Sequence, residues 1–145
     1  MGALNTKPAN LTNRSIADYA EKIGRHHDVY HEGRADLDAL LRRLGGRVAY
    51  AESEESLHVR QQGAFTVFLP HFTSVSRDRF TIAHELGHYF LHYRLAGLSG
   101  TKSYGRGARN RAETEANVFA SALLMPELEF RKWWGKTAGD EWQVA

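Results

Sequence analysis

The 145-residue sequence contains no cysteine, and this absence excludes a disulfide framework as well as a metal site built from thiolates. It also contains no uninterrupted apolar run of the length that a bilayer-spanning helix needs. The first residues, MGALNTKPANLTNR, are polar and lack the apolar core of a secretory signal. We therefore expect a cytoplasmic protein with no membrane contact.

The sequence also lacks a strong excess of either charge. Its 19 Lys and Arg residues and 17 Asp and Glu residues leave a formal net charge of +2, too weak to argue for direct nucleic-acid binding. One local asymmetry lies between positions 94 and 111, where a segment with four glycines carries no acid and five basic residues, namely Arg94, Lys102, Arg106, Arg109 and Arg111. We favour a flexible, solvated loop here and keep a binding surface or closing lid as the alternative.

The length and the 42% apolar content are those of one globular domain. We expect residues 1–14 to be disordered and residues 15–145 to form a single domain. Apolar residues at helical spacing predict helices from residue 15 to near Gly33, over 34–46, 77–94 and 110–125, and again after Pro126. Residues 47–52 and 57–70 predict a small, mostly antiparallel sheet packed on the third helix, with Pro70 at a sheet edge. The expected fold class is α+β.

Residues 79–95, RFTIAHELGHYFLHYRL, place His84, His88 and His92 four residues apart on one stripe of a predicted helix. Residues four apart lie one turn apart on the same face, so His84 and His88 can bind a single Zn²⁺ through their ring nitrogens. Glu85 lies about 100° further round the helix. That position is too far for a third ligand and suits a general base acting on a zinc-bound water.

An HExxH pattern also occurs by chance, and these histidines can simply lie at the border of the buried face of a core helix, with no metal bound. An apolar face does lie beside them, formed by Phe80, Ala83, Gly87, Phe90 and Leu91. The zinc hypothesis therefore depends on a third ligand. A third histidine six residues after His88 would fall at Arg94, which excludes that variant of the motif. His92 lies a further turn along the helix, where we expect it to support a ligand or to pack in the core.

A better third ligand lies in RAETEANVFASALLMP, residues 111–126. Glu113 and Asn117 are expected on the buried face of this helix and Glu115 on the solvent side. A buried carboxylate is costly unless it is paired or bound to a metal. We therefore expect Glu113 to complete the zinc site and Asn117 to hold the far nitrogen of a ligating histidine. Two histidines, one carboxylate and an open position for water make a catalytic zinc set, with one ion per chain.

With these segments the sequence resembles the ImmA/IrrE family of metallopeptidases, zinc proteins of bacteria, phages and mobile elements. The resemblance rests on RFTIAHELGHYFLH, on ETEANVFASALLMP and on their spacing, and extends more loosely over residues 15–135. It implies a zincin-like fold of the gluzincin type in which His84, His88 and Glu113 bind zinc and Glu85 activates water. It also implies a partner, because members act beside helix-turn-helix repressors and cleave or inactivate them to switch on a stress response or a mobile element.

The sequence departs from the family at its end. Family members commonly run on into a further helical segment, whereas this chain stops at DEWQVA, so we expect either a truncated or a short member. We interpret Trp133, Trp134 and Trp142 in this tail as packing residues.

Two functions fit these features. In the first, the protein is an endopeptidase whose substrate lies as an added strand along residues 65–69, with Tyr104 donating a hydrogen bond to the oxyanion. In the second, the protein keeps the zinc fold but only sequesters a repressor or another partner. The intact Glu85 favours the endopeptidase, because a pure binding protein needs no general base.

Overall fold

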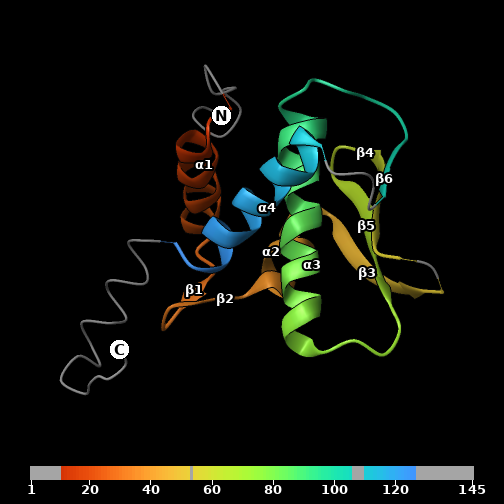
Figure 1. The fold of residues 1–145 in the computed structure, drawn as a ribbon, viewed down its shortest axis with the longest axis horizontal. Coiled ribbons are helices and arrows are strands. Elements are labelled where there is room, and N and C mark those ends of the chain that lie inside the picture. The colour runs from red at the N-terminus through yellow and green to blue at the C-terminus, as the bar shows by residue number, and fades with distance from the viewer. Residues whose placement is uncertain (1–10, 53, 106–109, 127–145) are drawn as a thin grey trace.

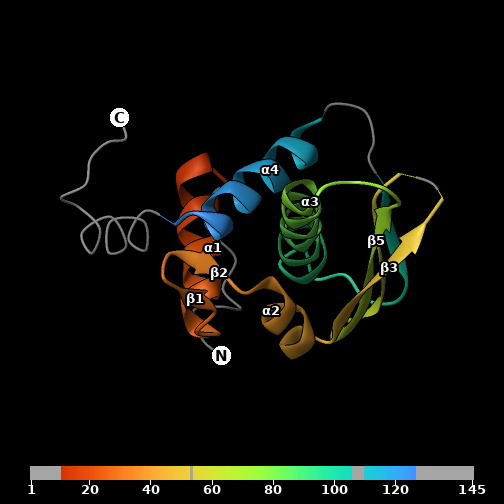
Figure 2. The same cartoon turned by 90° about the horizontal axis from the view of Figure 1, so that it is seen from below.

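The computed structural model describes residues 11–52, 54–105 and 110–126. Figures 1 and 2 show α3 at the centre, with the sheet on one side and α4 and α1 on the other. The expected α+β class is confirmed. The elements follow in the order α1 (Asn13–His26), β1 (Tyr30–His31), β2 (Arg34–Ala35), α2 (Leu37–Leu44), β3 (Gly46–Ala51), β4 (Ser56–Gln61), β5 (Ala64–Pro70), α3 (Val75–Gly87), the π-helix η2 (His88–Arg94), β6 (Lys102–Gly105) and α4 (Arg111–Leu124).

The main sheet has the strand order β3-β5-β4-β6. The pair of β3 and β5 is parallel and the other two pairs are antiparallel, so the sheet is mostly antiparallel as expected. Phe65, Val67 and Leu69 alternate along β5 and are buried on the face that packs toward the helices. Along these strands the alternation predicted by sequence is therefore confirmed.

The prediction that residues 65–69 form a sheet edge is wrong. β5 lies between β3 and β4 and pairs with both along its length. Pro70 is the last residue of β5 and does not mark a sheet edge. Within the described residues the two edges of this sheet are β3 and β6, so an added substrate strand cannot pair with β5.

α1 begins earlier and ends earlier than predicted. Thr12 and Ser15 form a capping box, so the helix starts at Asn13, two residues before the expected start of the ordered domain. The apolar stripe that predicted the helix, from Ile16 to Ile23, is buried. The helix does not continue to Gly33, because Asp28 has a left-handed φ of 55° and turns the chain into the β1–β2 hairpin.

α3 and η2 follow each other without a break and form one long helix, close to the helix predicted over residues 77–94. Ser74 caps its start by accepting a hydrogen bond from the Arg77 N–H at 3.1 Å. From His88 onward the helix is a π-helix, in which each N–H bonds to the carbonyl five residues earlier. The 2.9 Å bond from the Leu95 N–H to the Phe90 carbonyl is an example. Ala83, Leu86 and Phe90 are buried in the hydrophobic core.

The segment between α3 and α4 is not a flexible loop throughout. Residues 102–105 form β6, which pairs antiparallel with β4, so the favoured interpretation is wrong for this part. A four-residue strand that ends at a glycine is too short to show a periodic pattern. The guanidinium of Arg94 lies 5.3 Å from the centre of the Phe90 ring, and Arg106 and Arg109 lie outside the described residues. The five basic residues therefore form no surface that the structure describes.

α4 crosses α3 at close range and also packs on α1. Asn110 caps its start, and it ends at Leu124, close to the predicted bounds. The approach to α3 depends on Gly87, because a Cβ there would lie 3.1 Å from both the Cα and the carbonyl oxygen of Ala116. Because the helices cross here, the first turn of α4 lies next to the histidines of α3 and η2.

Several expectations fall on residues that the structure does not describe. These are the disorder of residues 1–10, the last helix after Pro126, the completeness of the C-terminus and the packing of Trp133, Trp134 and Trp142. Among the described helices, none is long and apolar enough to cross a membrane.

Candidate metal centre

His84 and His88 come from consecutive turns at the junction of α3 and η2. The helix passes this junction without a break, since His88 has helical φ and ψ angles of −63° and −42°. The two rings lie edge to face with their centroids 4.9 Å apart, and both residues are buried. The four-residue spacing therefore places both imidazoles on one side of the helix.

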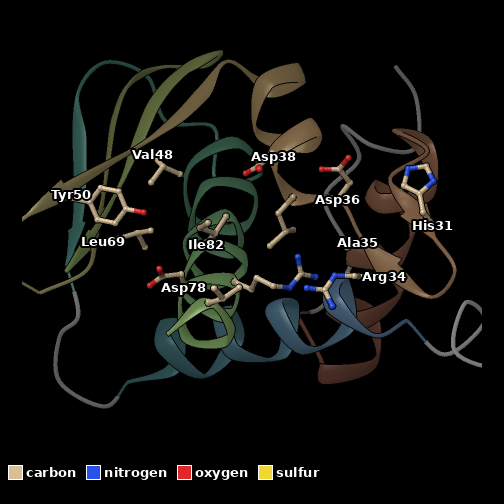
Figure 3. A pocket seen from close by; sticks show the side chains of 13 residues that line it. His31, Arg34, Ala35, Asp36, Asp38, Val48, Tyr50, Leu69, Asp78 and Ile82 are labelled. Atoms are coloured by element: carbon tan, nitrogen blue, oxygen red, sulfur yellow. The ribbon is translucent and has the colours of Figure 1, made fainter. Parts of the chain in front are cut away.

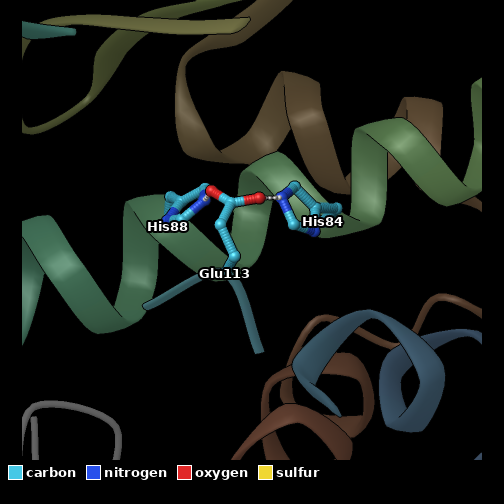
Figure 4. Close-up of side chains that lie close together, drawn as sticks. All are labelled: His84, His88 and Glu113. Atoms are coloured by element: carbon cyan, nitrogen blue, oxygen red, sulfur yellow. Dashed lines mark hydrogen bonds and ion pairs between the residues drawn. The ribbon is translucent and has the colours of Figure 1, made fainter. Parts of the chain in front are cut away.

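Glu113 reaches this pair from the first turn of α4. The Asn110 side chain accepts a hydrogen bond from the Glu113 N–H at 2.9 Å and so fixes where the glutamate leaves the helix. The carboxylate oxygens of Glu113 lie 3.1 Å from His84 Nε2 and 2.9 Å from His88 Nε2. Figure 4 shows the carboxylate of Glu113 between the two rings. The structure thus brings together the three residues predicted as ligands.

The chemistry and spacing of this trio fit a zinc ion. One donor atom from each residue lies within 4.8 Å of the other two. Donors on a tetrahedron with zinc bonds of about 2.1 Å are about 3.4 Å apart, close to the separations between Glu113 and the histidines. Three protein donors leave the fourth position open for water or substrate, which is the pattern of catalytic zinc sites.

The surroundings of His88 favour its neutral form. Burial, followed by the neighbouring His84 and His92, lowers the pKa of His88 from 6.5 to about 4, although Glu113 acts in the opposite direction. A histidine must be neutral at the nitrogen that binds a metal. His88 is therefore uncharged at neutral pH, which is one requirement for binding a metal.

Asn117 lies where it was predicted to support a histidine. Its Oδ1 is 2.8 Å from His84 Nδ1. Because an amide oxygen can only accept, His84 donates its Nδ1–H in this contact, which leaves Nε2 as the nitrogen that faces Glu113 and could bind a metal. Asn117 itself is an exposed residue and not part of the buried face on which it was expected.

His92 lies next to His88 and not among the grouped donors. Its Nδ1 is 2.9 Å from His88 Nδ1, and its Nε2 is 2.8 Å from a carboxylate oxygen of Glu115. The expectation that Glu115 faces solvent is wrong, since the residue is only 8% exposed. Ala116 and Leu123 lie at the middle of the buried face of α4. Phe119 also belongs to this face and lies on the side of the helix nearer to Glu115 than to Glu113. Both glutamates therefore flank this face, one on each side.

Glu85 lies within α3 directly after His84 and is not one of the grouped donors. Its side chain is buried, with the residue 1% exposed. Taking a carboxylate out of water is costly, and such groups are usually paired, bound to a metal or used in catalysis. The position is compatible with the predicted general base, a role that stays a prediction.

Tyr104 contacts the centre in a different way from the one predicted. Its ring stacks on His88 with centroids 5.5 Å apart and planes 12° from parallel. Its hydroxyl donates to the backbone carbonyl oxygen of His92 at 2.9 Å. Burial raises the pKa of Tyr104, which keeps this donor protonated. In this structure the hydroxyl proton is thus directed to His92 and not to a position for an oxyanion.

The roles of two residues near the centre were not predicted from the sequence. Gly87 lies inside the HExxH motif, where its close contact with Ala116 permits the approach of α4. Glu115 pairs with His92, and the signal that could have found it is the second glutamate two residues after Glu113. Neither role can be recognised without knowing how α4 crosses α3.

A pocket of about 610 Å³ is lined by residues of the β1–β2 hairpin, α2, β3, β5 and α3 (Figure 3). Val48, Leu69 and Ile82 contribute apolar surface to it, and Arg34 and Arg79 contribute charge. None of its lining residues belongs to the trio or to its contacts. The grouped metal-binding side chains of His84, His88 and Glu113, and not this pocket, therefore identify the candidate site.

Comparison with known proteins agrees with this geometry. Residues 42–144, well over half of the chain, match the family described as the IrrE N-terminal-like domain. The metallopeptidase ImmA of Bacillus subtilis strain 168 is 37% identical over 54 residues, a stretch that covers 37% of this chain and 31% of that protein. The alignment thus spans less than a third of the relative. On the family match, which includes the histidines and the glutamate of the centre, the chain belongs to the ImmA/IrrE metallopeptidase family.

Proposed function

We propose that this protein is a zinc-dependent endopeptidase that uses Glu85 as its general base. The observation that carries the proposal is the convergence of His84, His88 and Glu113 from two helices, with one donor atom each inside 4.8 Å. Three protein donors with an open fourth position are typical of catalytic zinc and not of structural zinc. Membership of a metallopeptidase family supports the same function.

In this proposal the ion and the side chains have separate tasks. His84, His88 and Glu113 would hold the zinc ion, which would supply Lewis-acid polarisation of the scissile carbonyl and of a water at the open position. Glu85 accepts a proton from the attacking water and passes it to the leaving amine. Asn117 keeps the Nε2 lone pair of His84 directed to the centre through its 2.8 Å contact with Nδ1. The burial of Glu85 separates this base from bulk water.

The substrate we propose is a helix-turn-helix transcriptional repressor. This part of the proposal rests on the family, whose members act beside such repressors, and the relative named above aligns over only 31% of its length. The cytoplasmic location expected from the sequence belongs to the same proposal, because a bacterial repressor works there. Direct contact between this chain and DNA is not part of it.

The substrate strand is better placed on β6 than on residues 65–69. Within the described residues β6 is a sheet edge. It is also the edge next to the centre, because Tyr104 of β6 stacks on His88. A peptide added to an edge strand is held by backbone hydrogen bonds, which position it without selecting its sequence. We therefore propose that the substrate pairs with β6 across the metal centre.

The experiment that tests the function compares the zinc-loaded protein with its Glu85→Gln variant in cleavage of a co-expressed repressor. Glutamine has nearly the shape of glutamate but cannot act as a base, so we expect the rate to fall by about 10²–10⁴-fold. Zinc content and the far-ultraviolet circular dichroism spectrum should not change, because no ligand is removed. Glu52→Gln, at a surface carboxylate that is 98% exposed, is the matched control and should cleave normally.

The opposite result would favour the regulatory binding protein. If the zinc-loaded parent binds the repressor without cutting it, or if Glu85→Gln cuts as fast as the parent, the endopeptidase mechanism is wrong. Metal analysis on the same samples ensures that a loss of cleavage reflects the base and not a loss of zinc.

A further inference from the structure

A chain of close polar contacts leads from the candidate metal centre through η2 to α4. His88 Nδ1 lies 2.9 Å from His92 Nδ1, and His92 Nε2 lies 2.8 Å from Glu115 Oε1. The side chains of His92 and Glu115 are only 16% and 10% exposed. We propose that His92 and Glu115 are positioning residues that fix the tautomer of His88 and thereby set how tightly the centre holds its metal. The inference rests on the metal site of the proposed function, but not on proteolysis.

Only one arrangement of protons satisfies both the metal and the contacts. His88 presents Nε2 to Glu113 at 2.9 Å, so Nε2 is the atom available to a metal. When a metal is bound there, Nε2 must carry a lone pair. The proton of neutral His88 is then on Nδ1, and His88 donates it to His92 Nδ1. Since His92 Nδ1 accepts, neutral His92 carries its own proton on Nε2 and donates it to the Glu115 carboxylate.

Glu115 is the residue that selects this arrangement. In the reverse arrangement His92 donates from Nδ1, and its bare Nε2 lone pair then faces a carboxylate oxygen at 2.8 Å. A carboxylate can only accept, so that contact becomes repulsive. His88 would also carry its proton on Nε2, where it blocks the metal. The carboxylate therefore disfavours the tautomer that cannot bind the ion.

Glu115 is itself held in place. Its second oxygen accepts from Arg111 Nε at 3.2 Å, and the Arg111 side chain is 81% exposed. One oxygen thus faces the surface guanidinium and the other faces His92. Tyr104 fixes the same segment from the other side, because its hydroxyl binds the His92 carbonyl and its ring stacks on His88. The two glutamates of the sequence RAETEAN have separate tasks, with Glu113 at the centre and Glu115 behind His92.

The proposal is tested by zinc affinity, measured in competition with a chelator. Glu115→Leu removes the acceptor and should weaken zinc binding by about 10–100-fold, the range that is typical for partners of metal ligands. Glu115→Gln can still accept through its amide oxygen, so we expect it to recover most of the lost affinity. Glu55→Leu is the matched control, since Glu55 is also a buried carboxylate paired with an arginine, Arg77, but it is not among the contacts of the centre.

A second measurement reads the protons directly. Long-range proton–nitrogen correlation spectra of the zinc-loaded protein distinguish the two imidazole tautomers. We expect His88 to be protonated at Nδ1 and His92 at Nε2 alone. This readout does not depend on the stability of any variant. It tests the arrangement of protons, whereas the zinc affinities of the Glu115 variants test which residue selects that arrangement.

Three results would overturn the inference. They are a His92 ring protonated at Nδ1 in the zinc-loaded protein, an unchanged zinc affinity in Glu115→Leu, and an equal loss of affinity in Glu55→Leu. If the unmutated protein binds zinc, any of these three results would refute only the positioning role of His92 and Glu115. A parent that binds no zinc would refute the proposed function as well, and a parent that binds zinc without cutting protein would refute only the endopeptidase.

Discussion

His84 is held from two sides by residues one turn apart on α4. Glu113 lies 3.1 Å from its Nε2, and Asn117 lies 2.8 Å from its Nδ1. One residue therefore shares the metal position with His84 while the other fixes the ring. His88 is supported from a different helix position, by His92 of η2. Each imidazole thus has a separate partner for the nitrogen that faces away from the centre.

We expect Asn117→Ala to weaken zinc binding by about 10–100-fold, because His84 loses the acceptor that orients its ring. Asn117 is exposed, so the free energy of unfolding of the metal-free protein should change by no more than about 0.5 kcal/mol. Ser121→Ala, one turn further along α4 and also exposed, is the control. Chelator competition and denaturant unfolding check both statements, and an unchanged zinc affinity would show that Asn117 has no supporting role.

At this scale the sequence predicted what depends on a single element. The spacing of His84 and His88 is a property of one helix, so it could be recognised without any tertiary contact. Glu115 was misplaced because its environment depends on how far the buried face of α4 extends toward Phe119. The stacking of Tyr104 on His88 could not be foreseen either, because it requires β6 to pair with β4.

Among the elements, the crossing of α3 and α4 determines whether the ligands meet. α3 and η2 supply the histidines and α4 supplies the glutamate, and the two helices touch at Gly87 and Ala116. A small displacement of α4 therefore changes the distances from Glu113 to both histidines at once.

Gly87→Val tests the importance of this crossing. The new side chain would meet the backbone of Ala116, which cannot move aside without shifting α4. We expect the free energy of unfolding to fall by about 1–3 kcal/mol and zinc affinity to fall with it. Gly105→Val is the control, because a Cβ there has no atom within 4 Å. Equal stability of the two variants in denaturant unfolding would mean that the crossing tolerates a wider separation.

The role of β6 as the substrate edge is also a question of elements. Backbone hydrogen bonds between antiparallel strands involve alternate residues. In a peptide that the protein cleaves, N-methylation of successive backbone amides should therefore raise KM at every second position near the scissile bond. A uniform effect, or none, would place the peptide away from a strand edge.

Those elements that contain a long apolar pattern were predicted close to their observed bounds, including α2, α3 and α4. The β1–β2 hairpin was missed because it consists of two strands of two residues each, which carry no periodicity. The position of β5 inside the sheet was missed because strand order depends on pairing between distant segments. Pro70 suggested an edge, but a proline at the last residue of a strand fits an interior strand equally well.

For the molecule as a whole, a bound ion would join two helices that are otherwise held by packing. A ligand that binds only the folded state stabilises it by about 2.7 kcal/mol at a free concentration of 100 times Kd. For a chain of this length that corresponds to a rise in Tm of roughly 5–10 °C. Differential scanning calorimetry with added zinc should show this rise, and a chelator should reverse it. Glu113→Ala should remove the effect, and a variant that still gained the full rise would exclude Glu113 as a ligand.

The central claim is that His84, His88 and Glu113 together hold one zinc ion, and crystals of the zinc-loaded protein test it most directly. An anomalous difference map collected at the zinc absorption edge should show one peak per chain. The peak should lie about 2.0–2.2 Å from His84 Nε2, from His88 Nε2 and from a carboxylate oxygen of Glu113. A map without a peak at this position, or with zinc bound by other residues such as His92 and Glu115, would contradict the account.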